Sequence, residues 1–101
     1  MTGINVKQTE LKTLFTQKLE NSIINDQAIA LTIANNVMEV RNIVLIENLE
    51  YDEDYLCIID GDYEMHLKLD EIDLEYDNSY HESFTLSNYA DENTKVYVEF
   101  I

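Results

Sequence analysis

The sequence predicts an α+β fold in which two N-terminal helices pack on an antiparallel β-sheet of five or six strands. Apolar residues recur at helical spacing up to residue 40, and short apolar runs bounded by turn residues follow from residue 41 onward. A chain of 101 residues can bury one modest core, and the chain has no proline that would mark a linker. We therefore expect a single domain over 1–101, with 1–40 helical and 41–101 forming an acidic antiparallel sheet.

The first helix is expected to begin at Thr9, whose side chain can cap it, after a frayed segment over residues 1–8. Its apolar residues follow the i, i+3, i+4 spacing of an amphipathic helix. That stripe consists of Leu11, Leu14, Phe15, Leu19 and Ile23.

The second helix is expected from Asn25 or Asp26 to about Val40. Its stripe consists of Ile29, Ile33, Val37 and Val40, widened by Ala28, Ala30, Leu31, Ala34 and Met38. This helix should therefore be more buried than the first. Its weak point is Asn35-Asn36, because asparagine is a poor helix former in the interior of a helix.

The segment 54–77 predicts a β-ribbon. A tight turn at Asp60-Gly61 would pair Ile58 with Tyr63, Cys57 with Glu64, and Leu56 with Met65. One face then collects Leu56, Ile58, Tyr63, Met65, Leu67 and Leu69, and the other collects Asp62, Glu64, His66, Lys68 and Asp70.

The apolar phase of the ribbon changes after Leu69, because the next apolar residues, Ile72, Leu74 and Tyr76, are even-numbered. A second turn at Asp70-Glu71 would absorb the change, and a bulge within one long strand is the alternative. With the turn, the cross-strand pairs are Leu69–Ile72, Leu67–Leu74, Met65–Tyr76, Lys68–Asp73, His66–Glu75 and Glu64–Asp77.

The remaining strands, turn and loop are predicted from shorter runs of residues. Residues 43–46 predict a strand covered on both faces, and 50–54 an acidic turn. Tyr80, Phe84 and Leu86 indicate a further strand, 87–94 a polar loop, and 95–101 a closing strand with Val96, Val98 and Phe100 facing inward. The strand 54–59 is apolar on both faces, since Tyr55, Cys57 and Ile59 share the carboxylate side. The helical pair is expected to cover them, with a second copy (a homodimer) or a partner as the alternative.

The charge balance constrains the partners. Six basic residues against 21 acidic ones give a net charge of −15, which excludes direct binding to nucleic acid or to an anionic membrane and favours a basic partner. Residues 1–46 carry four acids and four bases, so the whole net charge lies in 47–101, where 17 acids oppose Lys68 and Lys95. A single cysteine, no signal peptide and no apolar stretch long enough to span a membrane favour the cytoplasm. Cys57 is expected to be a buried, inert thiol.

Catalytic and metal motifs are not found. Calcium loops starting at Asp52 or Asp60 lack the required glycine at their sixth position, so at most a weak divalent-ion site remains at 52–54 or at Asp60 and Asp62. His66, His81 and the cysteine would bind zinc only with carboxylate ligands, and no ligand spacing supports such a site. We expect no catalytic residue, cofactor or metal ligand, and a chain that is not an enzyme.

The acidic face predicts a mimic of nucleic acid. Alternate residues on a strand lie about 6.6 Å apart, close to two axial steps of about 3.4 Å along a nucleic-acid strand. Rows of carboxylates at that spacing would fit a groove built for phosphates, and interleaved tyrosines could anchor the contact. The expected partner-binding residues are Glu50, Asp52, Glu53, Asp54, Asp62, Glu64, Asp70, Glu71, Asp73, Glu75 and Asp77.

In its size, its composition and runs such as 50–54 and 71–77, the chain resembles small acidic phage-encoded inhibitors: anti-CRISPR proteins, anti-restriction proteins and uracil-glycosylase inhibitors. The resemblance is in kind and covers the acidic half, without a shared motif. It implies a target such as a Cas or restriction nuclease, blocked by occupancy in the host cytoplasm.

Two alternatives remain. One is an immunity or antitoxin-type protein that caps a basic toxin. The other is an oligomeric accessory protein, assembled through the doubly apolar strand, whose acidic face is only solubilising, because charge prevents edge pairing of a small sheet.

Overall fold

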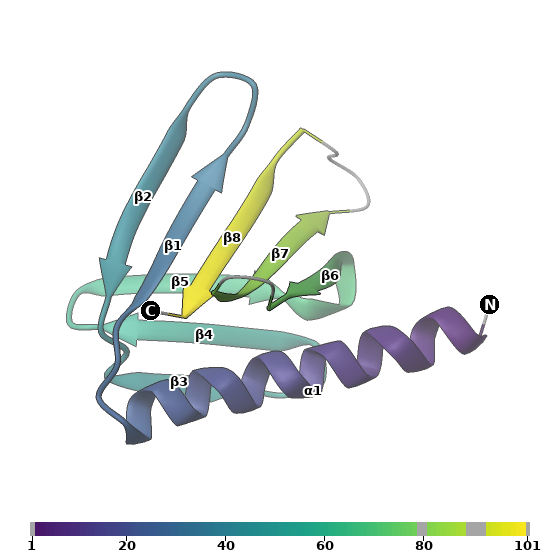
Figure 1. Ribbon diagram of the computed structural model, residues 1–101, viewed down its shortest axis with the longest axis horizontal. Helices are drawn as coiled ribbons and strands as arrows, with labels where there is room; N and C mark the ends of the chain where they lie inside the picture. Colours follow the sequence, from purple (N-terminus) through teal and green to yellow (C-terminus); the bar gives the residue numbers. More distant parts are fainter. Residues whose placement is uncertain (1, 79–80, 89–92, 101) are drawn as a thin grey trace.

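The computed structural model describes residues 2–78, 81–88 and 93–100, and the side chains among these from Gln8 onward. The described residues form one α-helix, one 3₁₀ turn and eight strands in two antiparallel sheets (Figure 1). The α+β class is confirmed, whereas the expected second helix and single sheet are wrong. In chain order the elements are α1 (Thr2–Ile24), β1 (Ile29–Ala34), β2 (Glu39–Val44), β3 (Asn48–Tyr51), β4 (Tyr55–Asp60), β5 (Tyr63–Lys68), η1 (Leu69–Glu71), β6 (Ile72–Asp77), β7 (Glu82–Asn88) and β8 (Lys95–Phe100).

The two sheets enclose the core together with α1. The larger sheet has the order β2-β1-β8-β7-β6, and the smaller one the order β3-β4-β5. Figure 1 shows β3 and β4 running alongside α1, while the strands of the larger sheet rise steeply across them. Phe15 of α1 and Phe84 of β7 are both fully buried, with ring centroids 4.9 Å apart. The helix is thereby joined to the inner face of the larger sheet.

The helix begins earlier than expected. It starts at Thr2, so Thr9 is an interior residue and not the cap, and residues 2–8 are helical. The apolar stripe is confirmed, because Phe15 and Leu19 are fully buried and its other members pack against the core. The helix ends in a Schellman motif, in which the Gln27 N–H bonds to the Ser22 carbonyl at 2.9 Å. Asp26 takes the left-handed position of that motif, with φ 57°.

The predicted second helix is a β-hairpin. β1 and β2 pair antiparallel, and Asn35, expected to weaken a helix, builds the turn. Its side-chain oxygen accepts hydrogen bonds from the N–H groups of Val37 (2.8 Å) and Met38 (3.0 Å). The run 29–34 alternates large residues, which face the core, with small ones, and that period of two suits a strand. Val37, assigned to the buried stripe, is 91% exposed at the hairpin tip.

The strand expected over 43–46 is also wrong in extent and environment. β2 ends at Val44 and is the edge strand of the larger sheet. Ile43 and Leu45 are exposed, whereas Val44 and Ile46 are buried. Only one side of this segment is therefore covered.

The hairpin of β4 and β5 is confirmed, but its turn lies one residue later than predicted. Asp60 pairs with Tyr63, so the loop is Gly61-Asp62, and Gly61 takes the first loop position with φ 59°. A glycine at that position is typical of a type II′ turn, whereas the predicted type I′ turn needs positive φ at both loop residues. Leu56 consequently pairs with Leu67 instead of Met65. Each pairing shifts by two residues, so the predicted faces of the ribbon survive.

The second predicted turn does not form a hairpin. The 3₁₀ turn η1 absorbs the change of phase, with Leu69 and Ile72 both buried at its ends. β6 then joins the larger sheet, where Leu74 pairs with Leu86 of β7. Every predicted pairing between 64–69 and 72–77 is therefore wrong, and so is the alternative bulge within one strand.

The last two strands agree with the prediction. Phe84 and Leu86 of β7 and Val98 of β8 are buried, and Val96 and Phe100 pack against the core. The predicted polar loop starts later than residue 87, because β7 continues to Asn88. Tyr80 and Ile101 lie outside the described residues.

Candidate functional site

The predicted partner-binding residues divide between the two sheets. Glu50 lies on β3, residues 52–54 form the β3–β4 turn, Asp62 lies in the β4–β5 turn and Glu64 on β5. Asp70 and Glu71 lie in η1, and Asp73, Glu75 and Asp77 follow on β6. All are exposed except Asp73, which is half-buried. The predicted cross-strand contacts of Lys68 with Asp73 and of Glu64 with Asp77 do not form, because β5 and β6 belong to different sheets.

The β3–β4 turn and η1 meet at one end of the molecule. The Leu69 N–H bonds to the Asp54 carbonyl at 2.8 Å, and the Asp54 N–H bonds to the Asp52 side chain at 2.9 Å. The carboxylates of 52–54 and Asp70 thereby face α1 across a groove of about 880 Å³. We call this hollow the acidic groove. Its helical wall consists of Gln8, Thr9, Lys12, Thr13, Thr16, Gln17 and Glu20, and Tyr51 and Leu69 complete it.

A second set of carboxylates lies on β6. Asp73, Glu75 and Asp77 share one face, opposite Ser87, Thr85 and Ser83 of β7 respectively. β6 is the edge strand of the larger sheet, so the three residues border one side of that sheet. We call them the acidic row. Glu71 in η1 lies between the acidic row and the acidic groove along the chain.

Some charged groups near these surfaces are already bonded within the chain. Lys18 forms an ion pair with Glu82, which also accepts a hydrogen bond from the Tyr76 hydroxyl at 2.7 Å. The hydrogen bond from Lys18 lowers the pKa of Glu82, and the same contact raises the pKa of Lys18. At the acidic groove, the pKa of the Tyr51 hydroxyl is raised mainly by partial burial. The charge of Glu20 raises it further.

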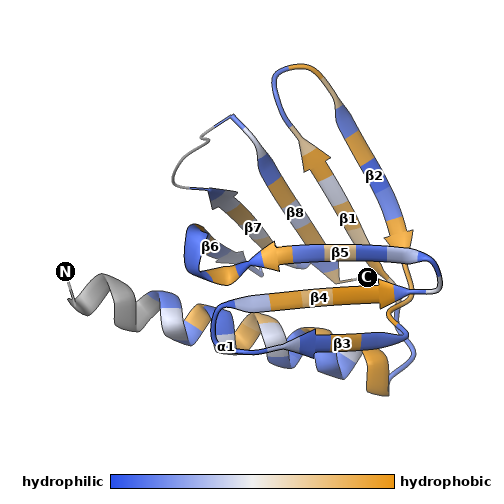
Figure 2. Cartoon of the chain, turned by 180° about the vertical axis from the view of Figure 1, so that it is seen from behind, coloured by the Kyte–Doolittle hydropathy of each residue, from blue (hydrophilic) through white to orange (hydrophobic). Residues whose placement is uncertain are grey.

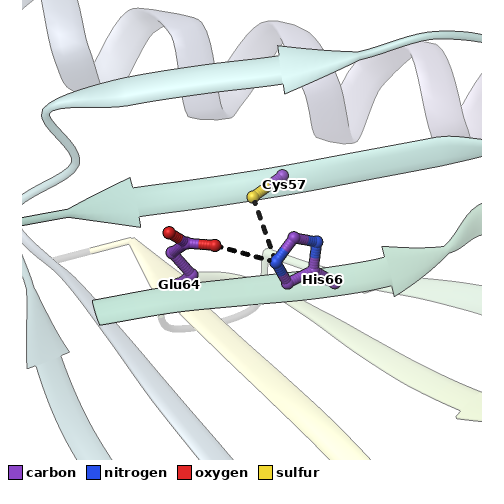
Figure 3. A group of neighbouring side chains, drawn as sticks. All are labelled: Cys57, Glu64 and His66. Atoms are coloured by element: carbon purple, nitrogen blue, oxygen red, sulfur yellow. Dashed lines mark hydrogen bonds and ion pairs between the residues drawn. The ribbon is translucent and has the colours of Figure 1, made fainter. Parts of the chain in front are cut away.

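A different cluster lies on the outer face of the smaller sheet (Figure 3). Cys57 of β4 pairs across the strands with His66 of β5, and Glu64 lies two residues before His66 on the same face. The His66 Nε2 atom is 3.1 Å from the Glu64 Oε1 atom and 3.8 Å from the Cys57 Sγ atom. The Tyr55 hydroxyl lies 2.5 Å from the other ring nitrogen of His66, Nδ1. The predicted contact of His66 with Glu75 is therefore wrong.

The position of the cluster also shows which face of the doubly apolar strand β4 the helix covers. Figure 2 shows α1 behind the smaller sheet, and Figure 3 shows the Cys57 side chain on the opposite face, so the helix does not cover it. Cys57 is nevertheless only 2% exposed, as expected of a buried thiol, and the His66 ring of the neighbouring strand lies 3.8 Å from its sulfur. The correct register was the missing signal. The predicted turn placed Cys57 opposite Glu64, whereas the observed one places it opposite His66.

Comparison of the chain with protein-family models, with curated proteins and with solved structures found no match. Within the described part of the chain, α1 is too polar to cross a membrane. A function for the chain must therefore be argued from its charged surfaces and from the geometry of the Cys57 cluster.

Proposed function

We propose that the chain is an acidic inhibitor that occupies the nucleic-acid-binding groove of a basic partner, such as a Cas or restriction nuclease. The observation that carries this proposal is the succession of carboxylates from the β3–β4 turn through η1 to β6, all of them exposed except the half-buried Asp73. A net charge of −15 on 101 residues opposes compact folding by self-repulsion. Binding to a basic partner would account for a charge that destabilises the free chain.

The acidic row supplies the regular element of the mimic. Side chains at alternate strand positions lie about 6.6 Å apart, which approximates every second phosphate of a nucleic-acid strand. Pairing with β7 holds the three backbone positions in register. A partner would therefore meet a preorganised line of charge, which lowers the entropic cost of binding.

The acidic groove supplies a concave element. Lysine or arginine side chains of a partner could enter it and meet the carboxylates of 52–54 and Asp70. Tyr51, which is 47% exposed, lies at the same groove and offers a large contact area with few rotatable bonds. The proposed interface thus combines charge that steers association with an aromatic anchor.

Affinity capture tests the proposal. The immobilised chain is incubated with lysate of a candidate host at low salt and eluted along a salt gradient, and a nucleic-acid duplex is then used as a competitor. We expect a basic nucleic-acid enzyme that elutes with rising salt and is displaced by the duplex. Capture of a basic protein that nucleic acid does not displace would favour a toxin as the partner, and capture of no basic protein would contradict the proposal.

A second candidate function is self-association of an accessory protein. The exposed apolar residues favouring it lie on the β1–β2 hairpin and at the end of β2, not on β4 as the sequence indicated. They are Val37, Met38, Val40, Ile43 and Leu45. Sedimentation of the purified chain distinguishes this candidate, because assembly through an apolar edge should persist at high salt.

A further inference from the structure

The Cys57 cluster brings three metal-binding atom types to one point. The Cys57 sulfur, a Glu64 carboxylate oxygen and a His66 ring nitrogen all lie within 4.8 Å of one another. The His66 and Glu64 side chains are about half exposed, at 53% and 56%, so an ion can approach from solvent. The sulfur lies beneath them, on a strand in the middle of the smaller sheet.

Two of the three separations, those from the His66 nitrogen, are close to the values for one ion bound by all three atoms. With bonds of about 2.3 Å to sulfur, 2.0 Å to nitrogen and 2.1 Å to oxygen, a tetrahedral zinc ion holds N and O about 3.3 Å apart and N and S about 3.5 Å apart. The observed separations are 3.1 Å and 3.8 Å. These two separations need adjustments of a few tenths of an ångström, and rotation of the exposed Glu64 side chain can set the distance from its oxygen to the sulfur.

Tyr55 orients the histidine ligand. Its hydroxyl holds Nδ1 of His66, which leaves Nε2 directed at Glu64 and Cys57. A phenolic hydroxyl can both donate and accept a hydrogen bond, so its oxygen can accept a hydrogen bond from Nδ1–H when Nε2 binds an ion.

A fourth donor lies in the same cross-strand row. Glu50 of β3 pairs with Cys57, which pairs with His66, so the three residues share the outer face of the smaller sheet. Glu50 is exposed, and its carboxylate is not among the three atoms that lie within 4.8 Å of one another. Its flexible side chain, or a water molecule, can complete a tetrahedral set.

We propose that Cys57, Glu64 and His66 bind a zinc ion, with Glu50 or water as the fourth ligand and Tyr55 as the residue that positions His66. A donor set of sulfur, nitrogen and oxygen favours zinc over calcium or magnesium, which prefer oxygen alone. Binding replaces the thiol proton of Cys57 by the metal, so that proton is released to solvent. The ion would join β4 to β5 and, through Glu50, to β3. Glu50 and Glu64 belong to the expected partner-binding residues, but neither lies in the acidic row or lines the acidic groove, so zinc binding can be tested without the inhibitor function.

Metal titration of the purified, chelator-treated chain tests the site. Cobalt(II), a spectroscopic substitute for zinc, should produce a thiolate-to-metal charge-transfer band that saturates at one ion per chain and disappears when zinc is added. Calorimetry should show zinc binding with proton release, and calcium should not compete. Absence of the band, or equal competition by calcium, would overturn the proposal.

Variants assign the ligands. His66→Gln should abolish the cobalt band, while His81→Gln, which alters the other histidine, should leave it unchanged. Tyr55→Phe should keep the band but weaken zinc affinity by roughly 10–100-fold, as expected for a group that orients a ligand. Because Cys57 is buried, a loss of the cobalt band in Cys57→Ser counts only if the circular dichroism of the variant matches that of the parent. If it does not match, the assignment of the site is judged from His66→Gln alone. Equal loss of binding in the His66 and His81 variants would contradict the assignment.

Discussion

The Tyr55 hydroxyl and Nδ1 of His66 lie 2.5 Å apart, and this contact determines the direction of the other ring nitrogen. Nε2 faces Glu64, whose carboxylate can only accept a hydrogen bond when ionised. In the metal-free chain, Nε2 therefore carries the proton, and the Tyr55 hydroxyl donates to Nδ1. Zinc binding at Nε2 requires the opposite tautomer.

The tautomer of His66 provides the first prediction. Nitrogen NMR at neutral pH should find the Nε2–H form in the metal-free chain and the Nδ1–H form after one equivalent of zinc is added. His81 in the same spectra serves as the internal control, since it should not respond. An unchanged His66 tautomer at saturating zinc would show that Nε2 is not a ligand.

Charge reversal on the acidic row provides the second prediction. Asp73→Lys/Glu75→Lys should weaken binding to a captured partner far more than Glu10→Lys/Glu39→Lys, which changes the net charge equally at exposed sites outside the acidic row and the acidic groove. Glu20 is not a suitable control, because it lines the acidic groove. Equal weakening by both pairs, in titrations at several salt concentrations, would mean that only total charge matters.

The Lys18–Glu82 contact provides a prediction about pH. The pKa of Glu82 is lowered in the folded chain, so the contact stabilises the fold above the ordinary carboxyl pKa, and the effect is lost as pH falls through the lowered value. The coupling free energy from a cycle of Lys18→Met and Glu82→Gln should be at most about 1 kcal/mol at pH 7, because the pair is partly exposed. It should vanish in urea unfolding at a pH well below 4.5. A coupling that persisted there would place the effect elsewhere.

Removing the ring of Phe15 should be costly. Phe15→Ala deletes a fully buried ring that packs on Phe84 and should lower the free energy of unfolding by about 3–5 kcal/mol. Ile24→Ala, at a helix position that is 78% exposed, should change it by less than about 0.5 kcal/mol. Denaturant unfolding measures both, and similar losses would contradict the packing of α1 on the larger sheet.

The end of α1 offers a stabilising change. Asp26 has φ 57°, a conformation that costs most residues about 1–2 kcal/mol and costs glycine little. Asp26→Gly should raise the melting temperature, since it also removes a negative charge near the helix C-terminus. Asp26→Ala removes the same charge but keeps a β-carbon, so it should be less stable than the glycine variant.

The errors of sequence interpretation have identifiable physical causes. The run 29–34 is apolar at both helical and strand spacing. It forms a strand because it pairs with β2 and with β8, which lies far along the chain. The two faces of the ribbon were predictable because alternation survives a shift of two residues. It was not predictable that β6 leaves the ribbon and joins the larger sheet, since a 3₁₀ turn and a tight hairpin turn produce the same change of phase.

The candidate sites differ in how far the sequence indicated them. Exposure of the acidic residues follows from the cost of burying charge, so their identities were predictable and their grouping was not. The acidic groove depends on the hydrogen bond between Leu69 and Asp54, which joins two separate turns. The Cys57 cluster depends on the position of Gly61, because moving the turn by one residue replaces His66 by Glu64 opposite the cysteine.

The pairing of β1 with β8 has a consequence for how the chain matures on the ribosome. β1 is complete by residue 34, but its second neighbour is supplied by residues 95–100. At about 5–20 residues per second, the β1–β2 hairpin waits for several seconds with one edge open. During that time its apolar residues are accessible to chaperones and to other nascent chains. Yield in the cell should therefore respond to translation speed and chaperone supply more than the stability of the finished protein suggests.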